Sequence, residues 1–169
     1  MTAPCWSFYA LGKPVAQGSK RHVGRGIMVE SAKDLKPWRD TVTSAAFGAG
    51  PKLDGPIAVR MIFTVPRAKS ARKVDTVPFK KPDIEKLARA VCDAITAAGL
   101  WNDDAQVADF VRLAKVYPSA SWDHEALPVP GVVMSAVEIV KGGDAVRDLW
   151  EITGKTVARA WKTYNGNND

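Results

Sequence analysis

The chain has 169 residues, of which 46% are hydrophobic and 25% are charged, and its formal net charge is +6. This length suits a single domain, because one hydrophobic core commonly serves roughly 100 to 200 residues. No apolar run approaches the ~18 residues of a membrane span, and the first residues lack the features of a secretory signal. We therefore expect a globular, cytoplasmic protein that makes no use of a membrane.

The predicted elements follow from hydrophobic spacing and from the glycines and prolines that interrupt it. In chain order we predict a strand at 6–11, a small hairpin at 21–29, a helix at 32–47 with Ser31 as N-cap, a strand at 56–65, a helix at 84–98 that ends at Gly99, strands at 106–117 and 131–140, and a helix from 143 to about 162 that is interrupted at Gly154. Residues 106–117 cannot place all their apolar side chains on one face, which favours either a bulge or a stretch that is buried on both faces.

These elements predict an α+β fold with a small mixed sheet of about four strands flanked by helices. We assign residues 1–142 to the main domain and residues 143–169 to a helical extension. The extension could pack on the core, brace a dimer or contact DNA, and its apolar spacing favours packing. Trp38 recurs at helical spacing with Leu35 and Val42, which favours a core role over a base-stacking role.

Positive charge is concentrated in two short segments. Residues 13–25 contain four cations and no acid, whereas residues 67–81 contain six cations and Asp75 as the one acid. Such clustering favours a polyanionic partner. The cysteines and His124 do not form the pattern of a zinc site. Cys5 and Cys92 have no nearby Cys or His companion, and His124 lies in a polar loop. We expect reduced, packed thiols and a solvated histidine.

Three acids lie in the segment 80–107, close in sequence to the second basic segment: Asp83, Glu85 and Asp104. Carboxylates within a cationic surface suit a phosphodiesterase, because Mg²⁺ takes oxygen ligands while Lys and Arg hold the nucleic-acid backbone. Residues two apart on a helix point about 200° from each other, so Asp83 is better placed as the N-cap with Glu85 in the first turn.

Asp104 has two routes to these acids. If the chain reverses at Gly99 and returns extended, its carboxylate can approach Glu85 within one subunit; alternatively it reaches the acids of a two-fold related partner. The structural alternative is that Asp83 is only a cap, Glu85 pairs with Arg89, and Asn102 to Asp104 form an ordinary turn.

The same segment resembles the signature of the RusA-type Holliday-junction resolvases, a P-D-x-D-N-x-x-K-x-x-x-D-A-L pattern followed by W-x-D-D. The matching residues here are Pro82, Asp83, Glu85, Arg89, Asp93, Ala94, Ile95, Trp101, Asp103 and Asp104. The stretch from Gly12 to Arg21, the helix with Trp38 and Arg39, and the strand order are also similar, so the likeness covers roughly residues 6–140.

The resemblance implies that Asp83, Glu85 and Asp104 bind the metal, Mg²⁺ or alternatively Mn²⁺, and that Arg89 takes the place of a catalytic lysine. Three residues depart from the family pattern, since Glu85 replaces aspartate, Lys86 replaces asparagine and Arg89 replaces lysine. Arginine keeps the positive charge, but it cannot donate a proton to a leaving oxygen.

The resemblance further implies a homodimer that resolves four-way DNA junctions by paired nicks, with a phage or prophage origin as an option. The alternatives are a nuclease that prefers flaps or forks, and a junction-binding protein with weakened catalysis. We expect DNA to contact these basic residues: Lys20, Arg21, Arg67, Lys69, Arg72, Lys73, Lys80, Lys81 and Lys86.

Overall fold

The computed structural model describes residues 3–18, 20–22, 28–30, 33–118 and 124–166, and for 20–22 and 28–30 it describes the backbone alone. The elements in chain order are β1 (Cys5–Leu11), β2 (Lys20–His22), β3 (Met28–Glu30), α1 (Leu35–Ala46), β4 (Ile57–Thr64), α2 (Ile84–Ala98), the 3-10 helix η1 (Asp104–Gln106), β5 (Val107–Val116), β6 (Gly131–Glu138) and α3 (Ala145–Gly166). Among these residues, no helix has the length and apolarity to cross a bilayer.

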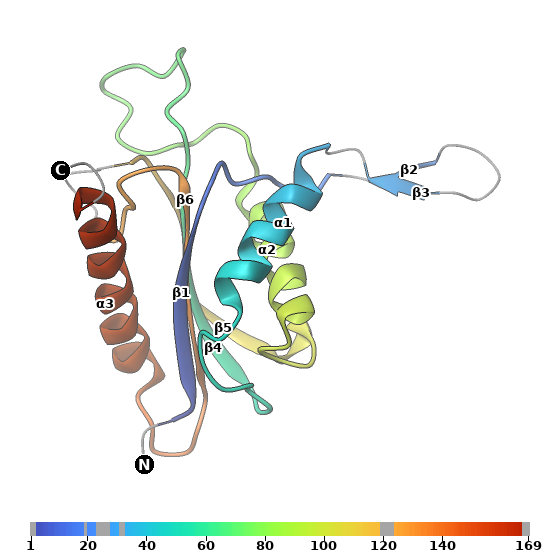
Figure 1. Cartoon of the computed structure of the whole chain (residues 1–169), viewed down its shortest axis with the longest axis vertical. Helices are drawn as coiled ribbons and strands as arrows, with labels where there is room; N and C mark the ends of the chain where they lie inside the picture. The colour runs from blue at the N-terminus through green and yellow to red at the C-terminus, as the bar shows by residue number, and fades with distance from the viewer. Residues whose placement is uncertain (1–2, 19, 23–27, 31–32, 119–123, 167–169) are drawn as a thin grey trace.

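Four strands form one mixed sheet in the order β1-β6-β4-β5, which confirms the predicted α+β class. β4 and β5 are parallel, whereas β6 runs antiparallel to both β1 and β4. α2 supplies the crossover that a parallel pair requires. Two register shifts interrupt the β4–β5 pairing, which agrees with a bulge as one of the two predicted alternatives. β2 and β3 form the predicted hairpin, which projects away from the sheet (Figure 1).

The helices cover opposite faces of the sheet (Figure 1). α1 and α2 cover one face, and the largest apolar cluster lies beneath them; Trp38, Val42, Leu87, Val91 and Ile95 are buried there. This burial confirms the core role predicted for Trp38. α3 covers the other face, where Leu149, Val157 and Ala160 pack against the sheet. The C-terminal helix therefore packs on the main domain.

Two predicted helix features are wrong. α1 begins at Leu35 rather than at residue 32, and Ser31 lies outside the described residues. This later start puts Pro37 in the first turn, where a missing N–H breaks no helical hydrogen bond. α3 continues through Gly154 without interruption. The buried residues Thr153 and Val157 on either side outweigh the ~1 kcal/mol that glycine costs in a helix.

Candidate active site

Asp83 lies at the N-cap of α2, as the sequence predicts. Its backbone is extended, with φ −69° and ψ 132°, and its side chain makes no capping hydrogen bond. The carboxylate is instead 47% exposed, and its Oδ2 atom lies 3.5 Å from Nζ of Lys86. Asp83 is thus a cap by position, while its carboxylate oxygens face solvent and stay available to a ligand.

Lys115 of β5 fixes the backbone that precedes Asp83. Its Nζ donates hydrogen bonds of 2.8 Å to the carbonyl oxygen of Lys80 and 2.8 Å to that of Pro82. Burial lowers the pKa of Lys115, and the nearby negative charge of Asp83 opposes that shift. The sequence does not indicate this role of Lys115, because a single lysine in an apolar strand gives no sign of which loop it reaches.

Asp104 opens η1, in a turn that its neighbours build. Asp103 Oδ1 accepts a hydrogen bond of 2.8 Å from the backbone N–H of Ala105, and Gln106 Oε1 accepts one of 2.7 Å from that of Asn102. Burial, followed by the charges of Asp104 and Asp93, raises the pKa of the Cys92 thiol to about 12. The 3-10 helix η1 also contacts α2, so Asp104 lies beside that helix.

One chain does not bring the three predicted acids together. In the described part of the chain, no three Asp, Glu, His or Cys side chains form a group that could hold a metal. Nine residues separate Asp83 from Cys92, which amounts to about 14 Å along a helix at 1.5 Å per residue. After Gly99 the chain passes through Trp101, which is buried and bridges to Leu53, and it returns only in β5, which begins three residues after Asp104. This detour leaves Asp104 away from the start of α2.

The charged residues on the exposed side of α2 differ in whether they form ion pairs. Asp93, a signature residue, forms an ion pair with Arg39 of α1 and so joins the two helices. Within the described residues, Glu85 and Arg89 are exposed and form no ion pair with each other. The local pairing considered from sequence is therefore not formed, and both side chains can meet a ligand.

The basic segment 67–81 is partly organised by its own charges. Arg67 donates to the carbonyl oxygens of Arg72 (3.0 Å) and Asp75 (2.9 Å), and its guanidinium lies 4.1 Å from the ring centroid of Tyr117. Burial disfavours a charged Asp75, but hydrogen bonds from Arg72 outweigh it and lower the pKa of the Asp75 carboxyl. Arg67 and Arg72 thus shape the segment.

The remaining predicted DNA-binding residues of this segment, Lys69, Lys73, Lys80 and Lys81, are exposed, and Lys86 is half-buried. The side chains of Lys20 and Arg21 lie outside the described part of the structure. Of these lysines, Lys80, Lys81 and Lys86 line the cleft that holds Asp83, and their contact with DNA stays a prediction.

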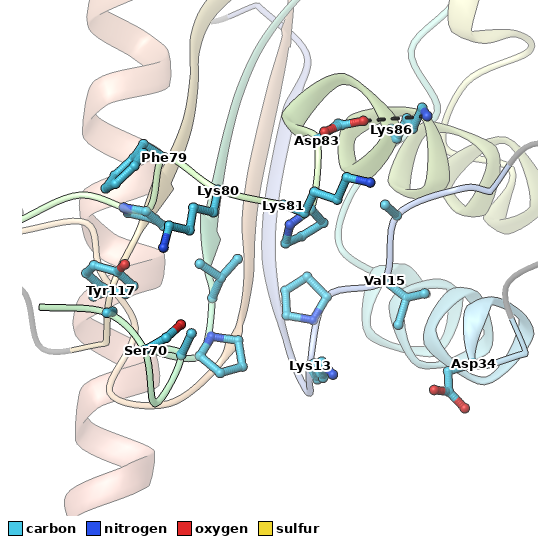
Figure 2. A pocket seen from close by; sticks show the side chains of 18 of the residues that line it. Lys13, Val15, Asp34, Ser70, Phe79, Lys80, Lys81, Asp83, Lys86 and Tyr117 are labelled. Carbon is cyan, nitrogen blue, oxygen red and sulfur yellow. Dashed lines mark ion pairs between the residues drawn. The ribbon is translucent and has the colours of Figure 1, made fainter. Parts of the chain in front are cut away.

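A cleft of about 620 Å³ opens beside Asp83 and Lys86. Its walls come from the segment after β1, the segment after β4 and residues 78–83. Figure 2 shows Phe79 and Tyr117 on one side, Val15 across from them, and the Lys86–Asp83 ion pair at one end. Sequence periodicity does not reveal this cleft, because its lining comes from loops that are far apart in the chain.

Exposed carboxylates at a helix start, next to a cleft bordered by lysines, are typical of proteins that act on nucleic acids. The family model described as Endodeoxyribonuclease RusA matches residues 12–120. The chain therefore belongs to the RusA endodeoxyribonuclease family, which confirms the resemblance seen in the sequence. No curated protein matches the chain.

Proposed function

We propose that this chain is a Mg²⁺-dependent endonuclease that resolves four-way DNA junctions by paired nicks, with Mn²⁺ as an alternative metal. The observation that carries the proposal is that Asp83, exposed at the start of α2, lines a lysine-bordered cleft in a chain of an endodeoxyribonuclease family, with Glu85 exposed two residues further on. Hard divalent cations take carboxylate oxygens as ligands, so these donors fit such a metal.

We further propose that the third acid comes from a second subunit. Among the described strands, β5 lies at an edge of the four-stranded sheet and has a neighbour only on the side of β4, and its Phe110 is 43% exposed. An unpaired edge favours pairing with another strand, and a two-fold dimer pairs identical edges antiparallel. Asp104 lies three residues before β5, and Lys115 is the penultimate residue of that strand. In such a pair, Asp104 lies near the partner subunit's Lys115, which holds the backbone beside the partner's Asp83.

In this arrangement, Asp83 and Glu85 of one subunit and Asp104 of the other would hold the metal. The metal would activate water and neutralise charge on the phosphate. Arg89 lies one turn beyond Glu85 and stabilises the negative charge of the phosphate, while the permanently charged guanidinium donates no proton. Lys80, Lys81 and Lys86 hold the flanking DNA backbone.

The first test compares a labelled synthetic four-way junction with a linear duplex of the same sequence, each with Mg²⁺ and with a chelator. The proposal requires paired nicks on the junction that depend on the metal. Equal cutting of both substrates contradicts junction selectivity. Flap and fork substrates identify a nuclease of different preference, and tight binding without nicks identifies a binding protein.

A second test distinguishes a shared site from a site within one subunit. Asp83→Asn and Asp104→Asn chains are co-expressed with different tags, and the mixed dimer is isolated. If the site is shared, one of its two sites combines Asp83 of one chain with Asp104 of the other, so single nicks return while each variant alone is inactive. If each site lies within one subunit, both sites of the mixed dimer lack an acid and no nicks appear.

A further inference from the structure

The cleft beside Asp83 has more apolar surface than phosphate binding requires. Its inner walls include Val15, Val65, Pro66, Pro78 and Tyr117. A strand's phosphates call for cations and N–H donors, whereas apolar walls suit a flat ring. The cleft therefore fits a nucleobase better than a stretch of DNA backbone.

Phe79 is the most available ring in this cleft. Its side chain lines the cleft and is 64% exposed, whereas Tyr117 is 8% exposed and carries the Arg67 guanidinium 4.1 Å from its ring centroid. Lys80 Nζ lies 5.8 Å from the Phe79 centroid. An exposed aromatic ring next to a lysine offers a stacking face together with a contact for the adjoining phosphate.

We propose that this cleft takes one unpaired nucleobase of branched DNA, stacked on Phe79, while Lys80 and Lys81 hold the phosphates on either side of it. The inference rests on the proposed function, and it adds the means by which the protein distinguishes a branch point from a duplex. Bases inside a duplex are stacked on both sides, so extruding one into the cleft costs a few kcal/mol, whereas a base at the branch point lacks part of that stacking and is extruded at lower cost.

The charge and the dimensions of the cleft agree with this occupant. Four lysines line it, Lys13, Lys80, Lys81 and Lys86, while the lining acids are Asp34, Asp75 and Asp83. Of these acids, Asp75 is bonded to Arg72 and Asp83 is a proposed metal ligand. Phe79 precedes Asp83 by four residues, at most about 14 Å of extended chain. The stacked base then lies within about four 3.4 Å steps of the phosphate at Asp83.

The test is a double-mutant cycle in the presence of chelator, so that binding is measured without cutting. The wild type and Phe79→Ala are titrated with a four-way junction, with the same junction carrying abasic nucleotides at its branch point, and with a duplex. We expect Phe79→Ala to weaken junction binding about 5- to 100-fold and to leave duplex binding unchanged. The abasic junction should show little further loss, because ring and base interact with each other.

Phe47→Ala is the matched control, since Phe47 is 84% exposed at the end of α1 and does not line the cleft. Phe79→Trp should retain binding. The base site is rejected if Phe79→Ala binds like Phe47→Ala, if it loses junction and duplex affinity equally, or if the abasic and alanine losses simply add. A wild type that binds junction and duplex equally well instead rejects the proposed junction function.

Discussion

The two faces of the sheet use charge in opposite ways. Beneath α3, Arg60 is 3% exposed and donates hydrogen bonds of 2.6 and 2.7 Å to the two oxygens of Glu125, which is 6% exposed and also pairs with Arg112. The Arg60 guanidinium lies 4.5 Å from the centroid of the Trp150 ring. At the cleft, in contrast, Asp83 and Lys86 are 47% and 44% exposed and lie 3.5 Å apart.

This difference separates charges that hold the fold from charges that are available to a ligand. A buried ion pair tolerates no loss of one partner, because the remaining charge is left without compensation in a medium of low dielectric. An exposed pair contributes little to stability, since water solvates either charge alone. Substitutions beneath α3 should therefore change unfolding, and substitutions at the cleft should change chemistry.

The largest effect is expected from Asp83→Asn. The amide lacks the negative charge that binds a divalent cation, so cleavage of a four-way junction should fall about a thousandfold or more, equivalent to about 4 kcal/mol. The side chain makes no capping hydrogen bond, so the melting temperature should stay near that of the wild type. Junction binding in chelator should also be retained. A variant that still cuts at the wild-type rate would remove Asp83 from the mechanism.

The opposite outcome is expected from Glu125→Gln. Loss of this charge leaves Arg60 and Arg112 without their shared carboxylate, and the free energy of unfolding should fall by about 3–5 kcal/mol. Urea denaturation measures this change, and cleavage per folded molecule should remain unchanged. Asp40→Asn, which removes an exposed ion pair with Lys36, should cost less than about 0.5 kcal/mol. Similar losses in the two variants would contradict the distinction between buried and exposed pairs.

Lys115 lies between these two classes, because its ammonium holds backbone rather than a counter-charge. Lys115→Met removes both hydrogen bonds to residues 80 and 82, and a small displacement of Asp83 should lower kcat about 10- to 100-fold with KM nearly unchanged. Arginine can donate to both carbonyl oxygens, so Lys115→Arg should recover part of kcat. Equal activity of the methionine variant and the wild type would exclude a positioning role for Lys115.

The sequence predicted the elements well wherever a local pattern specified them. α2 has the predicted bounds, because its apolar spacing and the positive φ of Gly99 at its end are local properties. The position of Asp83 followed in the same way from Pro82 and the start of that spacing. The start of α1 was missed, although the later start places Pro37 in the first turn. The continuity of α3 was missed because the burial of residues on either side of Gly154 decides it.

The site was predicted only in part, because its assembly depends on contacts between distant segments. Lys115 meets residue 80 across 35 positions, and Glu125 meets Arg60 across 65. Neither residue stands in a motif. The separation between Asp83 and Asp104 depends on the path taken after Gly99, where Trp101 enters the core. Composition and spacing named the acids, but they carried no information about that path.

The smallest effects are expected from alanine substitutions at two glycines, Gly154 and Gly99, which differ in backbone conformation but not in the space around them. Gly154 lies inside α3, and Gly99 ends α2 with φ +74°; a Cβ added at either would meet no atom within 4 Å. Space is therefore equal at the two sites, and only the backbone conformation differs. Gly154→Ala should raise the free energy of unfolding by about 0.5–1 kcal/mol, because alanine restricts the unfolded chain and favours the helix. Gly99→Ala should lower it by about 1 kcal/mol, since a Cβ is strained at positive φ.

Thermal unfolding of both variants measures the difference, and junction cleavage should be unchanged in Gly154→Ala because α3 covers the face away from the cleft. A loss of stability in Gly154→Ala would mean that α3 needs a flexible point in its middle, as the sequence alone had suggested.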